Sequence, residues 1–190
     1  MIKYAITGNI ASGKSQVEKV LVENNFIVFD ADKLAHDILV QDSTVRDAFK
    51  DYDVLENGLL SRTKLGRLVF NNASLRKKLE DIVHPLVKKR ILELFEEYKN
   101  EKYIFISIPL LFETGMNDMF DKIILVSIDR KIQLQRLINR NNLSEDDALS
   151  RINAQMLEDT KLTKSDYIIE NNSTIEEFMS MINKFVSGLN

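Results

Sequence analysis

The chain has 190 residues, of which 44% are hydrophobic, 26 are Lys or Arg and 29 are Asp or Glu, for a formal charge of −3. This composition is typical of a soluble globular domain and excludes intrinsic disorder, a global attraction to nucleic-acid phosphates and any cysteine chemistry. No apolar run approaches the roughly 18 residues that span a bilayer. We therefore expect a monomeric, cytoplasmic protein that binds neither nucleic acid nor a membrane.

Five short apolar runs predict strands, at residues 2–7, 26–29, 103–108, 122–127 and 166–169. They are unbroken rather than alternating, which is expected when helices cover both faces of a sheet. Longer helical patterns separate them, beginning with a helix over residues 14–24. The predicted fold is a single three-layer α/β/α domain with a five-stranded parallel sheet.

The long stretch between the second and third predicted strands looks helical. Residues 61–70 and 74–100 each begin at a serine that suits an N-cap, and Pro85 interrupts the second pattern. Because proline fits the first turn of a helix, we expect Pro85 to begin a new helix. Residues 55–100 are predicted to form a helical insertion that holds a substrate.

One motif carries a specific chemistry. Residues 8–15 fit G-x-x-x-x-G-K-[ST], and the motif lies between a predicted strand and a predicted helix, as it requires. Glycines let successive N–H groups point at an anion, and the helix N-terminus adds its positive dipole end. Lys14 is expected on the β- and γ-phosphates and the Ser15 hydroxyl on Mg²⁺. The predicted nucleotide contacts of this segment are Gly8, Asn9, Ile10, Ala11, Ser12, Gly13, Lys14, Ser15 and Gln16.

The rest of the sequence favours a kinase over a GTPase switch or an ATPase. The D-x-x-G and N-K-x-D motifs of a GTPase are absent, and the third predicted strand ends at Pro109 without the acidic residue that a typical ATPase uses to hold magnesium. An acidic pair, Asp30 and Asp32, follows the second predicted strand instead. A carboxylate there can accept a proton from an attacking hydroxyl or help to hold the metal. The alternative is that either aspartate only caps the helix that begins near Lys33.

Arginines suggest a lid over residues 136–160. Arg136 and Arg140 are four residues apart in a predicted helix over residues 130–142, and Arg151 and Gln155 repeat the spacing on the next helix, which starts near Ser144. Positive charge over a transferred phosphoryl group offsets charge in the transition state. Solvated surface arginines are the alternative.

With these pieces together, the chain resembles the dephospho-CoA kinases over nearly its whole length. The matching segments, in chain order, are residues 7–15, Asp30-Ala31-Asp32 with Ala35-His36, residues 65–70, residues 82–85, residues 109–113, the lid residues Gln133, Arg136, Arg140, Arg151 and Gln155, and residues 166–171. The resemblance implies a P-loop kinase that uses ATP and Mg²⁺ to phosphorylate the ribose 3′-hydroxyl of dephospho-CoA.

The resemblance also implies residue roles. Asp32 would be the catalytic base and a metal contact, assisted by Lys14 and Arg140. Arg136 and Asn171 would contact the nucleotide, with Asn171 near the adenine. The acceptor side would comprise Thr7, Asp32, His84, Pro85, Leu111, Phe112 and Glu113. From the residues alone, His84 is more typical of a packed or capping histidine.

Three positions depart from the family pattern. Asn9 and Ala11 replace glycines, and Gln16 replaces a threonine. If residue 11 needs a positive φ, the loop is strained by roughly 1–2 kcal/mol, and we expect a modest effect on ATP affinity. Two other functions stay open from the sequence: another small-molecule kinase, of nucleoside, shikimate or gluconate type, and a nucleotide-binding regulator that does not catalyse.

Overall fold

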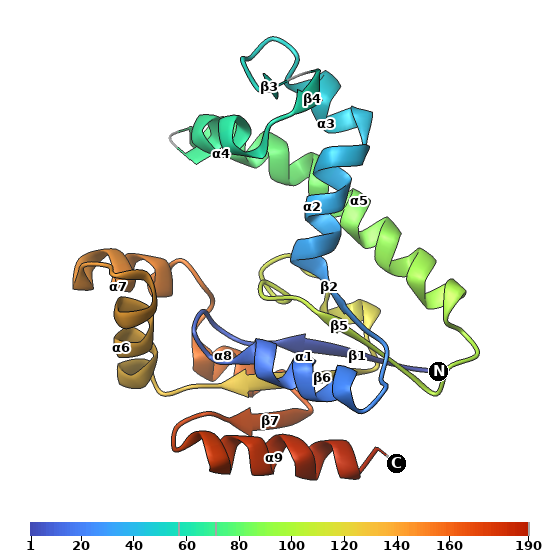
Figure 1. The fold of residues 1–190 in the computed structure, drawn as a ribbon, viewed down its shortest axis with the longest axis vertical. Helices are drawn as coiled ribbons and strands as arrows, with labels where there is room; N and C mark the ends of the chain where they lie inside the picture. Colours follow the sequence, from blue (N-terminus) through green and yellow to red (C-terminus); the bar gives the residue numbers. More distant parts are fainter. Residues whose placement is uncertain (57, 71, 190) are drawn as a thin grey trace. The chain divides into compact units, whose positions relative to one another are not determined.

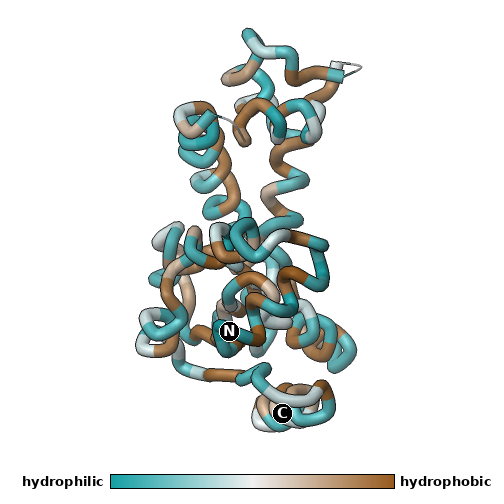
Figure 2. Tube along the Cα trace, turned by 90° about the vertical axis from the view of Figure 1, so that its left-hand side faces the viewer, coloured by the Kyte–Doolittle hydropathy of each residue, from teal (hydrophilic) through white to brown (hydrophobic). Residues whose placement is uncertain are grey.

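The computed structural model describes residues 1–56, 58–70 and 72–189. It divides into two compact units: Met1–Phe29 with Tyr98–Asn190, and Asp30–Glu97. Figure 1 labels their helices and strands. Hydrophilic and hydrophobic residues interleave along the helices (Figure 2), as helices with one packed face require. None of the described helices is long and apolar enough to cross a membrane.

The first unit contains the five-stranded sheet that the apolar runs predict. Its spatial order is β2-β5-β1-β6-β7, and β1 pairs in parallel with both β5 and β6, as β6 does with β7. The strands are β1 (Ile2–Thr7), β2 (Val28–Asp30), β5 (Tyr103–Ser107), β6 (Lys122–Ser127) and β7 (Tyr167–Glu170). Successive residues of β1, Tyr4, Ala5 and Ile6, are all buried, so both faces of the sheet are covered, as the unbroken runs indicate.

Helices cover this sheet. One hydrophobic core packs α1 and α9 against the sheet, where Val17, Leu21, Phe178 and Ile182 meet strand residues such as Phe105. The helices of this unit are α1 (Lys14–Glu23), α6 (Arg130–Asn141), α7 (Glu145–Asn153), α8 (Glu158–Leu162) and α9 (Ile175–Ser187), with a 3₁₀ turn at Asn117–Met119. The predicted α/β fold is therefore confirmed.

The second unit is mainly helical. Its elements are α2 (Ala31–Gln41), α3 (Ser43–Ala48), β3 (Leu55–Glu56), β4 (Leu59–Leu60), α4 (Arg62–Phe70) and α5 (Ala73–Glu97). The segment predicted as a helical insertion, 55–100, thus starts with an antiparallel strand pair. The compact unit itself begins earlier, at Asp30.

The prediction that Pro85 begins a new helix is wrong, because Pro85 lies inside the single helix α5. A proline removes one helical N–H and leaves the carbonyl four residues earlier, that of Asp81, without its partner. Pro85 and Asp81 are both exposed, so the interruption falls on the solvent side. Val83 and Val87 are buried on the other side, and their packing maintains the helix across the proline.

Candidate active site

The two glycines of the phosphate-loop motif are required by the local backbone. A Cβ on Gly8 would lie 2.6 Å from both the Ser12 hydroxyl and the carbonyl oxygen of Val126. Gly13 has φ 97°, and a Cβ there would overlap the side-chain amide of Asn171. The loop connects β1 to α1, which is the context that the motif needs.

The loop leaves backbone donors open. Among the described residues, no protein acceptor pairs with the amides of Ala11, Gly13, Lys14 or Ser15, whereas the amide of Ser12 donates to the Asn9 carbonyl at 3.0 Å. Gly13 also caps α1 without a side-chain hydrogen bond, so the first two N–H groups of this helix, those of Lys14 and Ser15, stay available, while the Gln16 amide donates to the Gly13 carbonyl at 2.9 Å. A chain of open amides at a helix N-terminus fits a phosphate group.

Ala11 adopts the left-handed conformation, with φ 63°. Residue 11, where the family has a glycine, therefore does need a positive φ, and the loop carries the expected strain of about 1–2 kcal/mol. Ala11 and Ile10 pack against a small cluster of Leu137, Ala148 and Ile152 from α6 and α7. This packing holds the strained residue in place.

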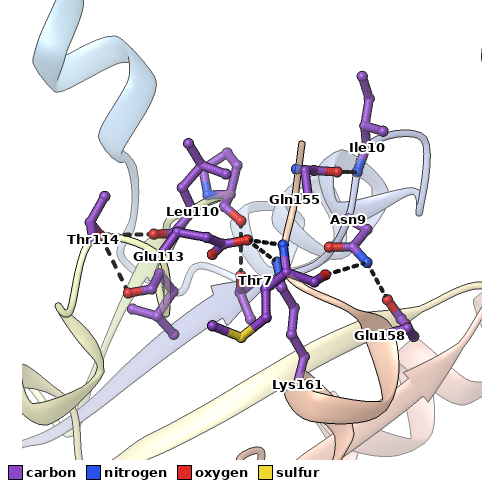
Figure 3. A network of polar contacts seen from close by, with 12 residues as sticks. Thr7, Asn9, Ile10, Leu110, Glu113, Thr114, Gln155, Glu158 and Lys161 are labelled. Carbon is purple, nitrogen blue, oxygen red and sulfur yellow. Dashed lines mark hydrogen bonds and ion pairs between the residues drawn. The ribbon is translucent and has the colours of Figure 1, made fainter. Parts of the chain in front are cut away.

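Two glutamines of the predicted lid pattern hold the backbone of Ile10 from both sides. The Gln155 side chain accepts a hydrogen bond from the Ile10 amide at 2.7 Å, and Gln133 donates to the Ile10 carbonyl at 3.0 Å. Asn9 donates through its side-chain amide to Glu158 at 2.7 Å (Figure 3). Asn9 thus makes a side-chain contact at a position where the family has a glycine. Together these contacts join the loop and the predicted lid in one hydrogen-bonded network.

Lys14 is also engaged inside the protein. Its ammonium lies 2.9 Å from a Glu18 carboxylate oxygen and 2.7 Å from the Ser107 hydroxyl. Ser107 in turn donates to the same Glu18 oxygen at 2.6 Å. The Ser15 side chain is exposed beside this group, and Gln16 is exposed as well.

Asn171 contacts the backbone of the phosphate loop. It is buried after β7 and its side-chain amide donates to the Ser12 carbonyl at 2.7 Å. The structure therefore gives this residue a role in the shape of the loop. Its predicted contact near the adenine stays a prediction.

Glu113, on the segment that follows β5, forms an ion pair with the buried Lys161. One of its carboxylate oxygens lies 2.9 Å from the Lys161 ammonium and accepts a hydrogen bond of 2.9 Å from the Met156 amide (Figure 3). Burial alone would raise the pKa of Glu113, but the Met156 amide and the Lys161 ammonium outweigh it and hold the pKa below the ordinary value. This contact ties the segment after β5 to the base of the lid.

The neighbours of Glu113 are less accessible. Leu111 and Phe112 are buried, and the Thr7 hydroxyl donates to the Pro109 carbonyl at 3.3 Å. These contacts fix the carboxyl ends of β1 and β5 against one another.

The predicted lid arginines lie where their spacing places them. Arg136 and Arg140 are one turn apart on α6, Arg136 half-buried and Arg140 exposed with its Nε donating to Asn141 at 2.9 Å. Arg151 is exposed on α7. The helix boundaries and the cap at Ser144 agree with the predicted lid helices.

The acidic pair and the histidines belong to the other unit. Asp30 caps α2 by accepting a hydrogen bond of 2.9 Å from the amide of Asp32, so the capping alternative is correct for Asp30. Asp32 is exposed in the first turn of α2. His84 is half-buried and Pro85 exposed on α5.

A cavity of about 450 Å³ adjoins the phosphate loop. It is bordered by Asn9, the start of α6 at Arg130, Gln133, Gln155 and Asn172. Its volume is in the range of small-molecule sites, and most of its lining residues have polar or charged side chains.

Some contact residues were not among the predicted site residues. Gln133 and Gln155 are visible in the sequence as part of the family's lid pattern, but a spacing cannot show that both bind the backbone of Ile10. Glu158 and Lys161 carry no sequence signal of their own, because their partners lie far away in the chain. The i,i+4 spacing of Lys14 and Glu18 was a usable signal, but the contact of Glu18 with Ser107 was not predictable from it. The described residues include no group of three His, Cys, Asp or Glu that could hold a metal ion by itself.

Comparisons with known proteins agree with this geometry. The family model described as dephospho-CoA kinase matches residues 2–177. The dephospho-CoA kinase of Helicobacter pylori is 37% identical over 97% of this chain and 96% of its own length. A solved dephospho-CoA kinase from Campylobacter jejuni superposes with a TM-score of 0.80 and 30% identity, over 98% of this chain and 96% of that one.

A more distant structure shares only the fold. Shikimate kinase from Bacteroides thetaiotaomicron has a TM-score of 0.55 at 14% identity, over 99% of this chain and 98% of that chain. The full-length family match and the relatives above 30% identity decide the assignment, and the chain belongs to the dephospho-CoA kinase family.

Proposed function

We propose that this protein transfers the γ-phosphoryl group of ATP to the ribose 3′-hydroxyl of dephospho-CoA, which gives coenzyme A and ADP. The observation that carries the proposal is the loop between β1 and α1, with four open amides, Lys14 and an exposed Ser15, in a chain of this family. Such a loop grips the phosphates of a nucleotide through backbone N–H groups and one ammonium.

Magnesium fits the residues present. Mg²⁺ is usually held by one or two protein groups together with substrate phosphates, rather than by a dedicated cage of carboxylates. The exposed Ser15 hydroxyl and the lack of a three-residue metal cluster among the described residues are consistent with an ion that arrives with the nucleotide. When bound, the ion neutralises phosphate charge, and Ser15 and Asp32 would hold it.

Positioning and charge neutralisation are the main work of the protein in this reaction. Lys14 binds the β- and γ-phosphates, while Arg136 and Arg140 bring positive charge from α6. Asp32 accepts the proton of the attacking hydroxyl. Because Gln133 and Gln155 attach the lid to Ile10, lid movement and loop geometry are linked.

The acceptor side combines two sets of residues. His84 and Pro85 lie on α5 within residues 55–100, which we assign to the acceptor. Leu111, Phe112 and Glu113 follow β5, and we assign them with Thr7 to the acceptor pocket. The fixed position of Glu113 against Lys161 supports this role, since a pocket wall must keep its shape when it is empty.

The test is ADP release coupled to a reporter reaction, with purified protein, ATP and Mg²⁺. We expect rapid ADP production with dephospho-CoA, and only background with adenosine, shikimate, gluconate or no acceptor. The product must also be a 3′-phosphate by mass and by sensitivity to a 3′-phosphatase. Equal rates with every acceptor, or none with dephospho-CoA, would refute the proposal.

A further inference from the structure

Strand β5, next to the strand that leads into the phosphate loop, ends without an acidic residue. The carboxylate of Glu18 lies at this strand end. Glu18 is on α1, and one of its oxygens accepts a hydrogen bond of 2.6 Å from the hydroxyl of Ser107 and lies 2.9 Å from the Lys14 ammonium. The Lys14 and Glu18 side chains are only 16% and 18% exposed, and Ser107 is fully buried. This is a partly buried three-residue group rather than a solvated surface ion pair.

The position of Ser107 in the sheet indicates what the group of Lys14, Glu18 and Ser107 can do. Ser107 is the last residue of β5 and pairs with Ile6 of β1, the strand that leads into the phosphate loop. In a typical ATPase of this superfamily, the end of a neighbouring strand carries an aspartate that helps to hold magnesium. Here that strand end carries a serine hydroxyl, and the hydroxyl holds the carboxylate of Glu18.

Glu18 also shares a helix face with the serine of the motif. Ser15 and Glu18 are three residues apart on α1, so their side chains neighbour one another. When a nucleotide binds, the Lys14 ammonium can leave the Glu18 carboxylate and pair with the phosphates instead. A carboxylate held by Ser107 next to Ser15 then faces the cation that accompanies those phosphates.

We propose that Glu18, positioned by Ser107, is a further acidic residue, in addition to Asp32, through which this protein recognises the magnesium ion of the bound nucleotide. This carboxylate comes from helix α1 and is held at the end of strand β5. The inference rests on the proposed use of ATP with Mg²⁺, and it adds a residue that neither the motif nor the family resemblance identifies.

A simpler role would be purely electrostatic, in which Glu18 only keeps Lys14 in place. The two roles differ in their dependence on the metal. A residue that acts through Lys14 changes nucleotide affinity equally with and without Mg²⁺, whereas a residue that contacts the ion or its water changes only the gain that Mg²⁺ produces.

The experiment measures binding of a non-hydrolysable ATP analogue by calorimetry, in Mg²⁺ and in EDTA, with no acceptor present. Wild-type protein is expected to bind more tightly in Mg²⁺. In Glu18→Gln, which preserves the size of the side chain, we expect this gain to fall about tenfold, the size of one lost contact to a charged group. The affinity in EDTA is expected to stay the same or increase, because a negative charge near the phosphates is gone.

Two further variants make the test specific. Glu18→Gln combined with Ser107→Asp returns a carboxylate to the strand and should restore most of the Mg²⁺ gain. Glu23→Gln, on the same helix but 57% exposed and paired with the exposed Lys19, should bind like the wild type in both conditions. Thermal unfolding of each variant verifies that it is folded.

The outcomes separate this inference from the proposed function. An unchanged Mg²⁺ gain in Glu18→Gln, or an equal loss in Mg²⁺ and EDTA, overturns the role of Glu18 and leaves the reaction untouched. No Mg²⁺ gain in the wild type overturns the metal assignment itself, and with it the inference. The acceptor specificity is decided independently by ADP release with dephospho-CoA.

Discussion

The ammonium of Lys161 is completely buried, and the carboxylate of Glu113, 48 residues earlier in the chain by their numbers, lies 2.9 Å from it. A buried ion pair adds little over an apolar pair, but removing one partner leaves an uncompensated charge in the interior. Glu113 also accepts a hydrogen bond from the Met156 amide, so its loss would leave the buried Lys161 ammonium without a counter-charge and this amide without its acceptor. The stability of the sheet unit therefore depends on this carboxylate.

Glu113→Ala is expected to lower the free energy of unfolding by about 3 kcal/mol. Urea unfolding followed by circular dichroism measures this. Glu23→Ala is the matched control, because the Lys19–Glu23 pair is 67% and 57% exposed and should contribute only about 0.5 kcal/mol or less. The double variant Glu113→Ala, Lys161→Met should recover part of the loss, and a loss as small as that of the control would contradict the buried-charge argument.

Glu113 also makes stability depend on pH. Its pKa is lower in the folded protein than in the unfolded chain, so its contribution is complete above the ordinary carboxyl pKa and is lost as the pH falls through the lower, folded pKa. Between neutral and acidic pH, the wild type should therefore lose stability more steeply than Glu113→Gln. Parallel curves for the two proteins, from urea titrations at several pH values, would show that this carboxyl is not linked to folding.

Ala11→Gly is expected to raise the free energy of unfolding by about 0.5 kcal/mol. Glycine relieves the left-handed strain at φ 63°, while the loss of a methyl group and of backbone restriction offsets part of the gain. The Michaelis constant for ATP should stay similar or fall. Ala148→Gly, in the middle of α7, should have the opposite sign and cost about 1 kcal/mol or more. A large rise in the Michaelis constant of Ala11→Gly would disprove the strain argument.

Asn171→Ala is expected to weaken the binding of ATP about tenfold, because the Ser12 carbonyl loses its buried donor and the loop loses its shape. A residue that acts through the loop should weaken inorganic tripolyphosphate and GTP by the same factor as ATP. Equilibrium binding of the three ligands measures this. A loss confined to ATP would instead assign Asn171 to the adenine.

Asp32→Asn should abolish nearly all turnover, by about a thousandfold if it removes a general base, while ATP still binds. Asp30→Asn is the control, since asparagine caps a helix as well as aspartate does and the hydrogen bond to the Asp32 amide can be kept. It should retain turnover within about tenfold. Wild-type-like turnover in Asp32→Asn would remove this residue from the chemistry.

The sequence was sufficient for those parts of the fold that local patterns determine. The unbroken runs gave the five strands, and the glycine-lysine motif gave the position of the loop, because each depends on neighbouring residues. β2 starts at Val28, two residues into its apolar run, so such a run locates a strand without fixing its first residue. Pro85 shows the same limit: its effect on a helix depends on which side faces water.

The polar contacts of the site could not be derived in this way. Asn9 binds Glu158, Lys14 binds Glu18 and Ser107, and Glu113 binds Lys161. Most of these partners are separated by many residues and meet only when the lid and β5 pack next to the loop. Composition and spacing determine which side chains are available, and tertiary packing determines which of them meet.

The hydrogen bond from Asn171 to Ser12 joins residues 159 positions apart. During synthesis on the ribosome, the loop therefore emerges 159 residues before the donor that supports its backbone. A nascent chain that ends before Asn171 presents this loop without that hydrogen bond. We expect nascent chains to acquire tight nucleotide binding only after Asn171 has left the exit tunnel.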